Sequence, residues 1–558
     1  WLPSLPYIDA RGGLGIARSN ETIDEAATAA GRDPREIRRL LNVNVEAPAV
    51  DEWVEQLLPF VVEHGFATLI LGSDDARTIR TYGEEVAPAL RAAVERERRS
   101  AGTPTGPVRS AKALAQRVDR IDYDAVPEGL EAIEPGDGAY SRVRSTYLRH
   151  GSPGLVLRPQ TPDQVVEALA YARTQDVPLA IRSGGHGVSG RSTNNGGIVL
   201  DVGRLDNVEI LDAETGRIRV GPGARWAEVA RVLQPHGLGM SSGDHGDVGV
   251  GGLATAGGIG LLAHLHGLTI DHVTAVEIVL ADGRKVRADA DTDPDLLWAV
   301  RGAGGNFGIV TSFELDAYAV GDVVLSVMTF DAADTAALLE RWGATVEAAP
   351  RELTSFLSLA PRQGVAQLQT VVATDDLDFA TTCLTPLLDA GPLLDQQAQL
   401  VPYAAVLPSH GAVHKGAAEE PAFRSGLVDH LTPEVAAATA ALAASGEAPL
   451  IQIRQVGGAI NDLDPMATAY AHRTQNFCLG AVGLSLPGLN RRWDADVQPL
   501  MQGRYLSGDT DTRAERLDDA FPGATLDRLR ALKAVYDPDN VFNQNVPITP
   551  AAQASAAA

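Results

Sequence analysis

Cysteine and basic residues are scarce in this sequence. Only Cys383 and Cys478 occur among 558 residues, which excludes a disulfide framework and is compatible with a reducing cytoplasm. Lys and Arg number 47 against 72 Asp and Glu, so the net charge is −25. This deficit argues against nucleic acid as a partner, because binding a phosphate backbone requires clustered basic side chains. We interpret the acidity as a solvated, soluble surface.

The sequence also lacks any apolar run that approaches the length of a membrane span, so we expect no membrane partner. It begins with Trp1 rather than Met, and a leader could therefore have been removed. We expect a cytoplasmic protein and leave export open. The length predicts two to four domains.

Glycine, in contrast, is gathered in three runs, at residues 182–187, 248–260 and 301–310. Glycine permits tight turns and close backbone approach, and successive N–H groups in such turns form a nest for anions. Each run adjoins an apolar stretch that is typical of a strand. The three runs together predict a site for a large phosphate-bearing cofactor. Phosphate binding explains Arg182 but does not require His186, so we expect a separate task for that imidazole.

The runs Arg-Ser-Gly-Gly-His-Gly (182–187), Val-Gly-Val-Gly-Gly (248–252) and Arg-Gly-Ala-Gly-Gly-Asn-Phe-Gly (301–308) resemble the FAD domain of the vanillyl-alcohol-oxidase superfamily. The stretch Tyr-Asp-Pro-Asp-Asn-Val-Phe-Asn-Gln-Asn (536–545) narrows the resemblance to the berberine-bridge-enzyme-like oxidoreductases. The similarity runs from about residue 140 to residue 548. It implies an α+β fold, with a two-part PCMH-type FAD-binding domain and an antiparallel-sheet substrate domain that has helices on one face.

The resemblance also implies FAD as the cofactor. The residues that we expect to bind it are Arg182, Ser183, Gly184, Gly185, His186, Gly187, Ser242, Gly243, Val248, Gly249, Gly251, Gly252, Thr255, Gly257, Gly258, Gly260, Ile309, Val310, Asn543 and Asn545. We expect no metal.

Two histidines bear on how the flavin is held. In this family, bicovalent members carry a flavin-bonded cysteine at the position of His245, where imidazole cannot form the thioether link. The resemblance therefore implies a single covalent bond, from His186 to the 8-methyl group of the isoalloxazine. The alternative for His186 is a hydrogen-bonding histidine in the turn.

The catalytic base is less clear from the sequence. Related enzymes carry a Tyr-x-Asn-Tyr element after the substrate domain, and the aligned stretch here reads Gln502, Gly503, Arg504, Tyr505. We predict Tyr505, His245, Arg504 and Gln502 as the catalytic residues. An ordinary tyrosine, with a pKa near 10, is a poor base at neutral pH, but Arg504 could lower that pKa by favouring the phenolate.

Other assignments stay open for this region. Tyr505 could be a packed aromatic residue with a satisfied hydroxyl group. Tyr403 and Tyr470 are further candidates for the base, and Arg504 could instead hold a substrate carboxylate or carbonyl group.

The N-terminal segment differs from the rest. Residues 23–43 and 60–75 resemble the last part of the luciferase-like flavin monooxygenases, which implies an α/β segment like part of a TIM-type barrel. A barrel cannot close on that fraction, because its open strand edges must be covered. The segment is therefore either a piece of a longer fusion or a docking module for a partner or a second copy, and we assign it no catalysis.

The local patterns, together with the family resemblance, predict the order of the domains along the chain. The substrate domain shows strand patterns at 323–330, 354–359, 367–373, 450–455 and 479–484 and a helix at 335–347. The predicted parts are a barrel remnant (1–105), a linker (106–138), the FAD-binding domain (139–318), the substrate domain (319–520), a return to the FAD domain (521–548) and a disordered tail (549–558).

Our first functional hypothesis is an FAD-dependent oxidase that acts on a small alcohol, a sugar-like ring or a natural-product intermediate. Hydride would pass to flavin N5, and O2 would reoxidise the flavin to give H2O2. The first alternative is a dehydrogenase on the same scaffold with another acceptor. The second is a non-catalytic flavin-containing partner module.

Overall fold

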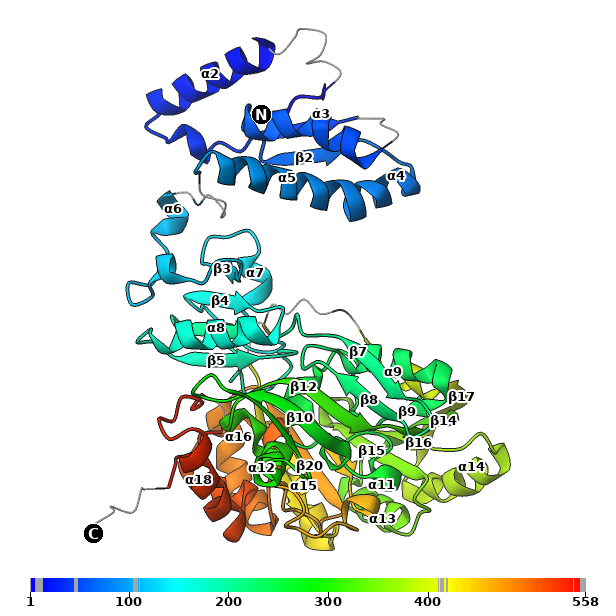
Figure 1. Ribbon diagram of the computed structural model, residues 1–558. Helices are drawn as coiled ribbons and strands as arrows, with labels where there is room; N and C mark the ends of the chain where they lie inside the picture. The colour runs from blue at the N-terminus through cyan, green and yellow to red at the C-terminus, as the bar shows by residue number, and fades with distance from the viewer. Residues whose placement is uncertain are drawn as a thin grey trace, which may run out of the picture. The chain divides into compact units, whose positions relative to one another are not determined.

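The computed structural model describes residues 2–5, 14–44, 49–103, 109, 111–409, 411, 416–417, 420–544 and 546–551 and is shown in Figure 1. The chain divides into two compact units, residues 1–116 and 117–558. None of the described helices is long and apolar enough to cross a membrane.

The first unit is a small α/β body. Strands β1 (Leu40–Val43) and β2 (Thr68–Leu71) pair in parallel, and α3 (Val50–Val62) connects them. Leu41 and Val43 of β1 pack against Trp53 and Leu57 of α3. The other helices of this unit are α2 (Leu14–Ala29), α4 (Ala76–Thr81), α5 (Ala87–Ser100) and the short α6 (Ala111–Leu114). This β-α-β unit agrees with the expected rhythm, while its relation to luciferase-like enzymes stays a prediction.

The second unit begins with a four-stranded sheet in the order β3-β4-β6-β5. Its strands are β3 (Glu131–Ile133), β4 (Leu155–Arg158), β6 (Ile198–Asp201) and β5 (Leu179–Arg182), and its helices are α7 (Tyr140–Val143) and α8 (Pro162–Arg173). Residues 117–138, which we expected to be linker, belong to this body, because β3 pairs with β4 and Arg117 forms an ion pair with Glu134. Residues 106–108 and 110 of the expected linker lie outside the described residues.

A five-stranded antiparallel sheet follows in the order β11-β10-β12-β8-β7. Its elements are β7 (Val208–Asp212), β8 (Arg217–Val220), β10 (Val273–Val279), β11 (Lys285–Asp289) and β12 (Ile309–Asp316), with helices α9 (Trp226–Leu233), α10 (Val250–Leu253), α11 (Ala263–His266) and α12 (Pro294–Ala303) and a small ladder of β9 (Leu238–Gly239) with β13 (Tyr318–Ala319).

The third sheet has seven antiparallel strands in the order β17-β14-β16-β15-β19-β20-β18. Its strands are β14 (Asp322–Asp331), β15 (Leu353–Ala360), β16 (Val365–Val372), β17 (Leu393–Pro402), β18 (Ala422–Val428), β19 (Leu450–Gln455) and β20 (Phe477–Gly483). The helices of this region are α13 (Thr335–Glu347), α14 (Leu377–Leu384), α15 (Pro433–Ala444), α16 (Leu486–Arg492), α17 (Leu517–Ala520) and α18 (Ala524–Tyr536).

The two faces of this sheet have different neighbours, because successive side chains of a strand point to opposite faces. Leu357 of β15 and Leu479 of β20 pack with Trp342 of α13 and other helix residues. Phe356 and Cys478, one position away, pack with residues of the FAD-domain region such as Leu262. The sheet therefore has helices on one face, as expected. Residues of its opposite face line the same cavity as the glycine runs.

A buried lysine of the C-terminal segment, Lys533, connects that segment to the third glycine run. The Lys533 ammonium group is fully buried and donates to the Asp537 carboxylate (2.6 Å), to the Asn306 carbonyl (2.6 Å) and to the Phe542 carbonyl (3.0 Å). Asn306 belongs to the third glycine run, and its side chain accepts from the N–H of Ile548 (3.2 Å). Lys533 thus connects the 536–545 stretch, through Asp537 and Phe542, to Asn306 of the third glycine run, which precedes Lys533 by 227 residues.

Replacing Lys533 by methionine tests the contribution of the buried Lys533–Asp537 ion pair to stability. The change leaves the buried Asp537 carboxylate without its cation, and breaking a buried pair from one side costs about 3–5 kcal/mol. We expect the free energy of unfolding, measured by urea titration, to fall by that order. The control is Lys285→Met, which removes the exposed partner of Asp163 and should cost less than about 1 kcal/mol. Equally small losses in both variants would show that the buried pair is not important.

Candidate functional site

The three glycine runs meet at one cavity of about 540 Å³ in the second unit. Gly184, Gly249 and Gly304 each represent one run in its wall. The seven-stranded sheet contributes a further part of the wall, through alternate residues of β19 and β20. The sequence therefore predicted correctly that distant glycine runs serve a common site.

The first two runs touch backbone to backbone. A Cβ atom at Gly184 would lie 2.3 Å from the Gly249 nitrogen, and one at Gly249 would lie 2.4 Å from the Gly184 nitrogen. No side chain fits at such distances without a shift of the main chain. Arg225 fixes the same junction, because its guanidinium donates to the carbonyl oxygens of Gly184 (2.6 Å) and Asp247 (2.5 Å).

The second and third runs are joined through Thr255. Its carbonyl oxygen accepts from the N–H groups of Gly302 and Gly304, both at 3.2 Å. A Cβ atom at Gly304 would lie 2.5 Å from the Thr255 Cβ. The glycines are thus needed for packing of loop against loop as well as for any approach of a ligand to the backbone.

Arg182 is the first residue of the first run, and an ion pair holds it in place. It ends β5 and is buried, and its guanidinium forms two hydrogen bonds with Asp201 at the end of the neighbouring β6 (2.8 and 3.1 Å). Ser183, the next residue, accepts from the N–H of Gly252 (3.2 Å). The sequence suggested that Arg182 binds phosphate. Arg182 is not part of the cavity wall, however, so its role is to position the loop.

His186 and His245 face the same part of the cavity. The His186 ring stacks on Tyr147, with 4.6 Å between ring centroids and planes 14° apart. The His245 ring lies 5.4 Å from His186 and 6.4 Å from Tyr147. The two imidazoles that the sequence singled out are therefore neighbours, and Tyr147 is a third member that no motif indicated.

Of the predicted catalytic residues, Tyr505 and His245 line the cavity. Burial raises the pKa of Tyr505 above its usual value near 10, and the Gly258 N–H, which donates to the phenolic oxygen (3.0 Å), offsets only part of that rise. The expectation that Arg504 lowers this pKa is wrong. The Arg504 guanidinium donates instead to the Asp511 carbonyl (3.2 Å), in a buried group with Asp509.

The remaining candidates lie outside the cavity wall. Gln502 is exposed, and its amide accepts from the N–H of Asp429 (2.7 Å) and donates to the Asp429 carboxylate (3.3 Å). Tyr403 and Tyr470 are buried, and burial raises the pKa of both phenols far above the usual value. Neither tyrosine is a base at neutral pH.

The sequence analysis missed a charged pair in the cavity. Arg454 of β19 donates to the carboxylate of Asp244 (2.9 Å), which precedes His245. Gln452, two residues before Arg454, accepts from the Arg454 Nε (2.9 Å) and donates to the same carboxylate (3.4 Å). All three side chains line the cavity. The signal was available, because two polar residues spaced by two in a buried strand share one face.

Most of the residues expected to bind the cofactor line this cavity. They are Ser183, Gly184, Gly185, His186, Gly187, Gly243, Val248, Gly249, Gly251, Gly252, Thr255, Ile309 and Val310. Arg182, Ser242, Gly257, Gly258, Gly260 and Asn543 are not in its wall, and Asn545 lies outside the described residues. Gly257 and Gly258 instead make room for neighbours, because a Cβ atom at Gly257 would lie 2.7 Å from the Tyr505 ring.

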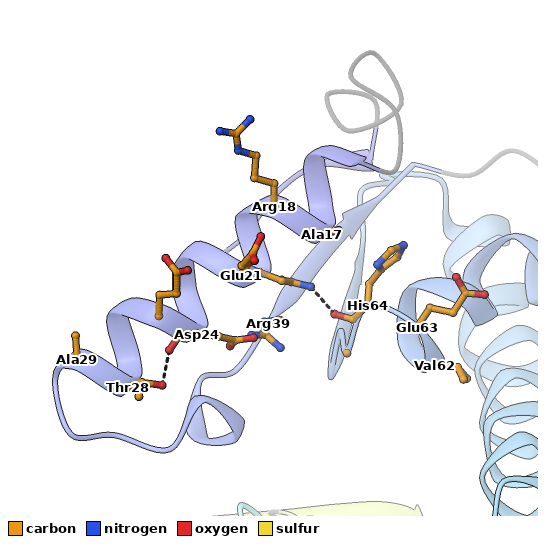
Figure 2. A pocket seen from close by; sticks show the side chains of 13 residues that line it. Ala17, Arg18, Glu21, Asp24, Thr28, Ala29, Arg39, Val62, Glu63 and His64 are labelled. Carbon is orange, nitrogen blue, oxygen red and sulfur yellow. Dashed lines mark hydrogen bonds and ion pairs between the residues drawn. The ribbon is translucent and has the colours of Figure 1, made fainter.

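A second cavity, of about 1410 Å³, lies within the first unit (Figure 2). Side chains of α2, Arg39 and the end of α3 surround it, and Asp24 forms an ion pair with Arg39. The Asn20 amide donates to the His64 carbonyl (3.0 Å). The cavity is open and charged and contains none of the predicted site residues. Across the described part of the chain, no three His, Cys, Asp or Glu side chains are arranged to hold a metal ion.

Two family models match segments that contribute to the first cavity. A family model described as an FAD binding domain matches residues 153–289, and one described as berberine and berberine like matches residues 510–549. This chain contains an FAD-binding domain. The cavity that the three glycine runs line fits such a cofactor, and FAD is therefore the cofactor that we assign to this domain.

Known proteins resemble parts of the chain. The FAD-dependent monooxygenase tpcD of Cochliobolus heterostrophus is 34% identical over 44% of this chain and 47% of its own length. The (R)-6-hydroxynicotine oxidase of Paenarthrobacter nicotinovorans is 37% identical over 34% of this chain and 41% of its own length. The matched segments thus span less than half of these curated relatives.

Among solved structures, the glucooligosaccharide oxidase of Acremonium strictum superposes with a TM-score of 0.66 and 22% identity, over 76% of this chain and 98% of that one. This likeness supports the fold of the FAD domain and of the sheet that covers the cavity. The structure is described as carrying a 6-S-cysteinyl, 8α-N1-histidyl FAD.

The contact of Gly184 with Gly249 can be tested by Gly249→Ala. An added methyl group must push the two loops apart, and overpacking of this kind costs about 1–3 kcal/mol. We expect a lower melting temperature and a lower flavin content per protein, measured from visible absorbance. Gly321→Ala is the control, because a Cβ atom at Gly321 meets nothing within 4 Å. Flavin content equal to the control would contradict the proposed importance of this contact.

Proposed function

We propose that this protein is an FAD-dependent oxidase in which His186 holds the flavin by a single covalent bond. Its substrate would be a small organic molecule with an oxidisable C–H bond, such as an alcohol, a sugar-like ring or a natural-product intermediate. The reduced flavin would be reoxidised by O2, which yields H2O2. The observation that carries this proposal is the position of His186, which stacks on Tyr147 in the wall of the cavity formed by the glycine runs.

A single bond is favoured by the chemistry of the neighbouring groups. His245 lies beside His186 and carries no thiol. Cys478 is the one thiol among the described residues of the cavity wall, and burial raises its pKa to about 11. A thiol needs to be ionised to react as a nucleophile, so Cys478 stays inert near neutral pH.

FAD, when bound, supplies the acceptor for a hydride, and the protein supplies position and exclusion of water. Residues 184–187 line the cavity, and we infer that their glycine-rich backbone would hold the pyrophosphate. Arg225 and Arg182 hold that loop in place from behind. The inward face of β19 and β20 covers the cavity, with Gly480 leaving room for a substrate beside Val482 and Leu450.

The choice of O2 as the acceptor rests on small side chains. Gly249, Gly251 and Gly252 line the cavity. A Cβ atom at Gly249 or Gly251 would meet neighbouring protein, whereas one at Gly252 would meet only the Ser183 hydroxyl, at 3.8 Å, so Gly252 is the glycine that leaves space for a small molecule. This feature supports an oxidase over a dehydrogenase. Peroxide release under air, with substrate present, separates these two functions.

The covalent bond is tested by precipitating the purified yellow protein with acid. We expect the colour to stay with the wild-type protein and to wash out of His186→Ala, because only a covalent bond survives unfolding. The matched control is His236→Ala, which replaces an exposed histidine outside the cavity and should keep its colour.

If the wild-type colour washes out, His186 is a turn histidine and the flavin dissociates. The dehydrogenase would then become the preferred function. If no substrate bleaches the flavin in the absence of oxygen, the non-catalytic module becomes the better explanation.

For residues 1–105 the proposal is a docking module for a partner or a second copy of the chain. Its support is that this part forms a compact body of its own, with a core built on Leu41, Trp53 and Leu57. The measurement is the mass of the whole protein in solution by light scattering.

A further inference from the structure

The proton acceptors expected from the sequence are not available as bases. The Tyr505 phenol has a raised pKa, and its oxygen already accepts from the Gly258 N–H. The Nδ1 atom of His245 accepts from the N–H of Asp247 (3.2 Å). A neutral imidazole that accepts at Nδ1 carries its proton on Nε2, so His245 presents a donor at that atom.

Asp244 remains as an acceptor. Among the described residues that line the cavity it is the only carboxylate. It lies in the loop that leads into the second glycine run, directly before His245. Its side chain is partly buried, and it faces the cavity from the FAD domain while its partner Arg454 faces it from the sheet.

The hydrogen bonds of Asp244 leave one oxygen for a proton. Arg454 Nη2 and Gln452 Nε2 both donate to Oδ2 (2.9 and 3.4 Å), and Oδ1 takes part in neither bond. Arg454 is itself held by the Gln452 carbonyl and lies over the Phe356 ring, 5.5 Å from its centroid. The carboxylate is therefore oriented by a fixed guanidinium and remains an acceptor.

We propose that Asp244 is the catalytic base and that Arg454 is its positioning residue. The step rests on the proposed function: the O–H proton of a CH–OH substrate passes to Asp244 Oδ1, the C–H hydrogen leaves with its electron pair to FAD as the oxidant, and a C=O bond forms. Asp244 later returns its proton to solvent. Because Arg454 is paired with Asp244, the cavity favours a neutral hydroxylated substrate over a carboxylate.

The test follows anaerobic bleaching of the flavin with three hydroxylated probes: cellobiose, xylobiose and benzyl alcohol. We expect Asp244→Asn to bleach at least about 100-fold more slowly with the best probe, the lower end of what general base catalysis supplies. The slowing of the wild-type reaction in acid should be absent in this variant. Flavin content, and affinity for the oxidised product measured by fluorescence titration, should stay within about twofold of wild type, because an amide keeps the shape of the carboxyl group.

Three variants separate a base from a group that only balances charge. Asp244→Glu keeps a carboxylate and should recover part of the rate. The double variant Asp244→Asn with Arg454→Gln removes both charges but supplies no base, so it should stay slow. Asp395→Asn removes an exposed carboxylate of β17 outside the cavity and should match wild type.

The outcomes are distinct. If the double variant regains the wild-type rate, Asp244 only compensates Arg454 and the inference is wrong. If Asp244→Asn bleaches as fast as wild type, with the same dependence on pH, the inference fails while the oxidase proposal stands. If none of the probes bleaches the wild-type flavin, the proposed function and the inference fall together.

Discussion

The close approach of Gly184 to Gly249 is the constraint on which the rest of the site depends. The loop after β5 and the start of α10 meet there, at a separation that admits no Cβ atom on either side. Arg225 bridges the same two loops through their carbonyl oxygens. Because Thr255 joins the second run to the third in a similar way, a displacement at any one run would be transmitted to the other two.

The C-terminal stretch depends on the same arrangement. Lys533 joins Asp537 to the carbonyl of Asn306, so residues 537–548 are fixed to the third glycine run rather than to a surface of their own. Buried ion pairs contribute little net stability when their desolvation is counted, but they define one geometry because any other leaves a charge without a partner. This reasoning explains how residues so far from the first run in sequence belong to the same FAD-binding body.

Much of the fold could be predicted from local pattern. The helix expected at residues 335–347 has those bounds. Thr161 caps α8 and Pro162 lies in its first turn, a pairing of residue types that is typical of helix starts. The strand expected at residues 450–455 also has those bounds. These features depend on neighbours in sequence, through hydrogen bonds at helix ends and the alternation of strand side chains, and such information is local.

The catalytic residues could not be predicted in the same way. Gln502, Arg504 and Tyr505 are adjacent in an aligned motif, yet they point to three different surroundings: the Asp429 loop, a buried ionic group and the cavity. The pair of Asp244 and Arg454 joins positions 210 residues apart, and no motif connects them. Only the folding of the sheet over the glycine runs brings the two charges together.

The ion pair of Asp244 and Arg454 has both a structural role and a proposed catalytic role. Asp244 lies on the FAD-domain side of the cavity and Arg454 on the sheet that covers it, so their contact joins the two sides. Gln452 bonds to both side chains and holds them in one arrangement. The same contact orients the Asp244 carboxylate in the cavity wall. One ion pair therefore both joins the sheet to the FAD domain and fixes the direction of the proposed proton acceptor.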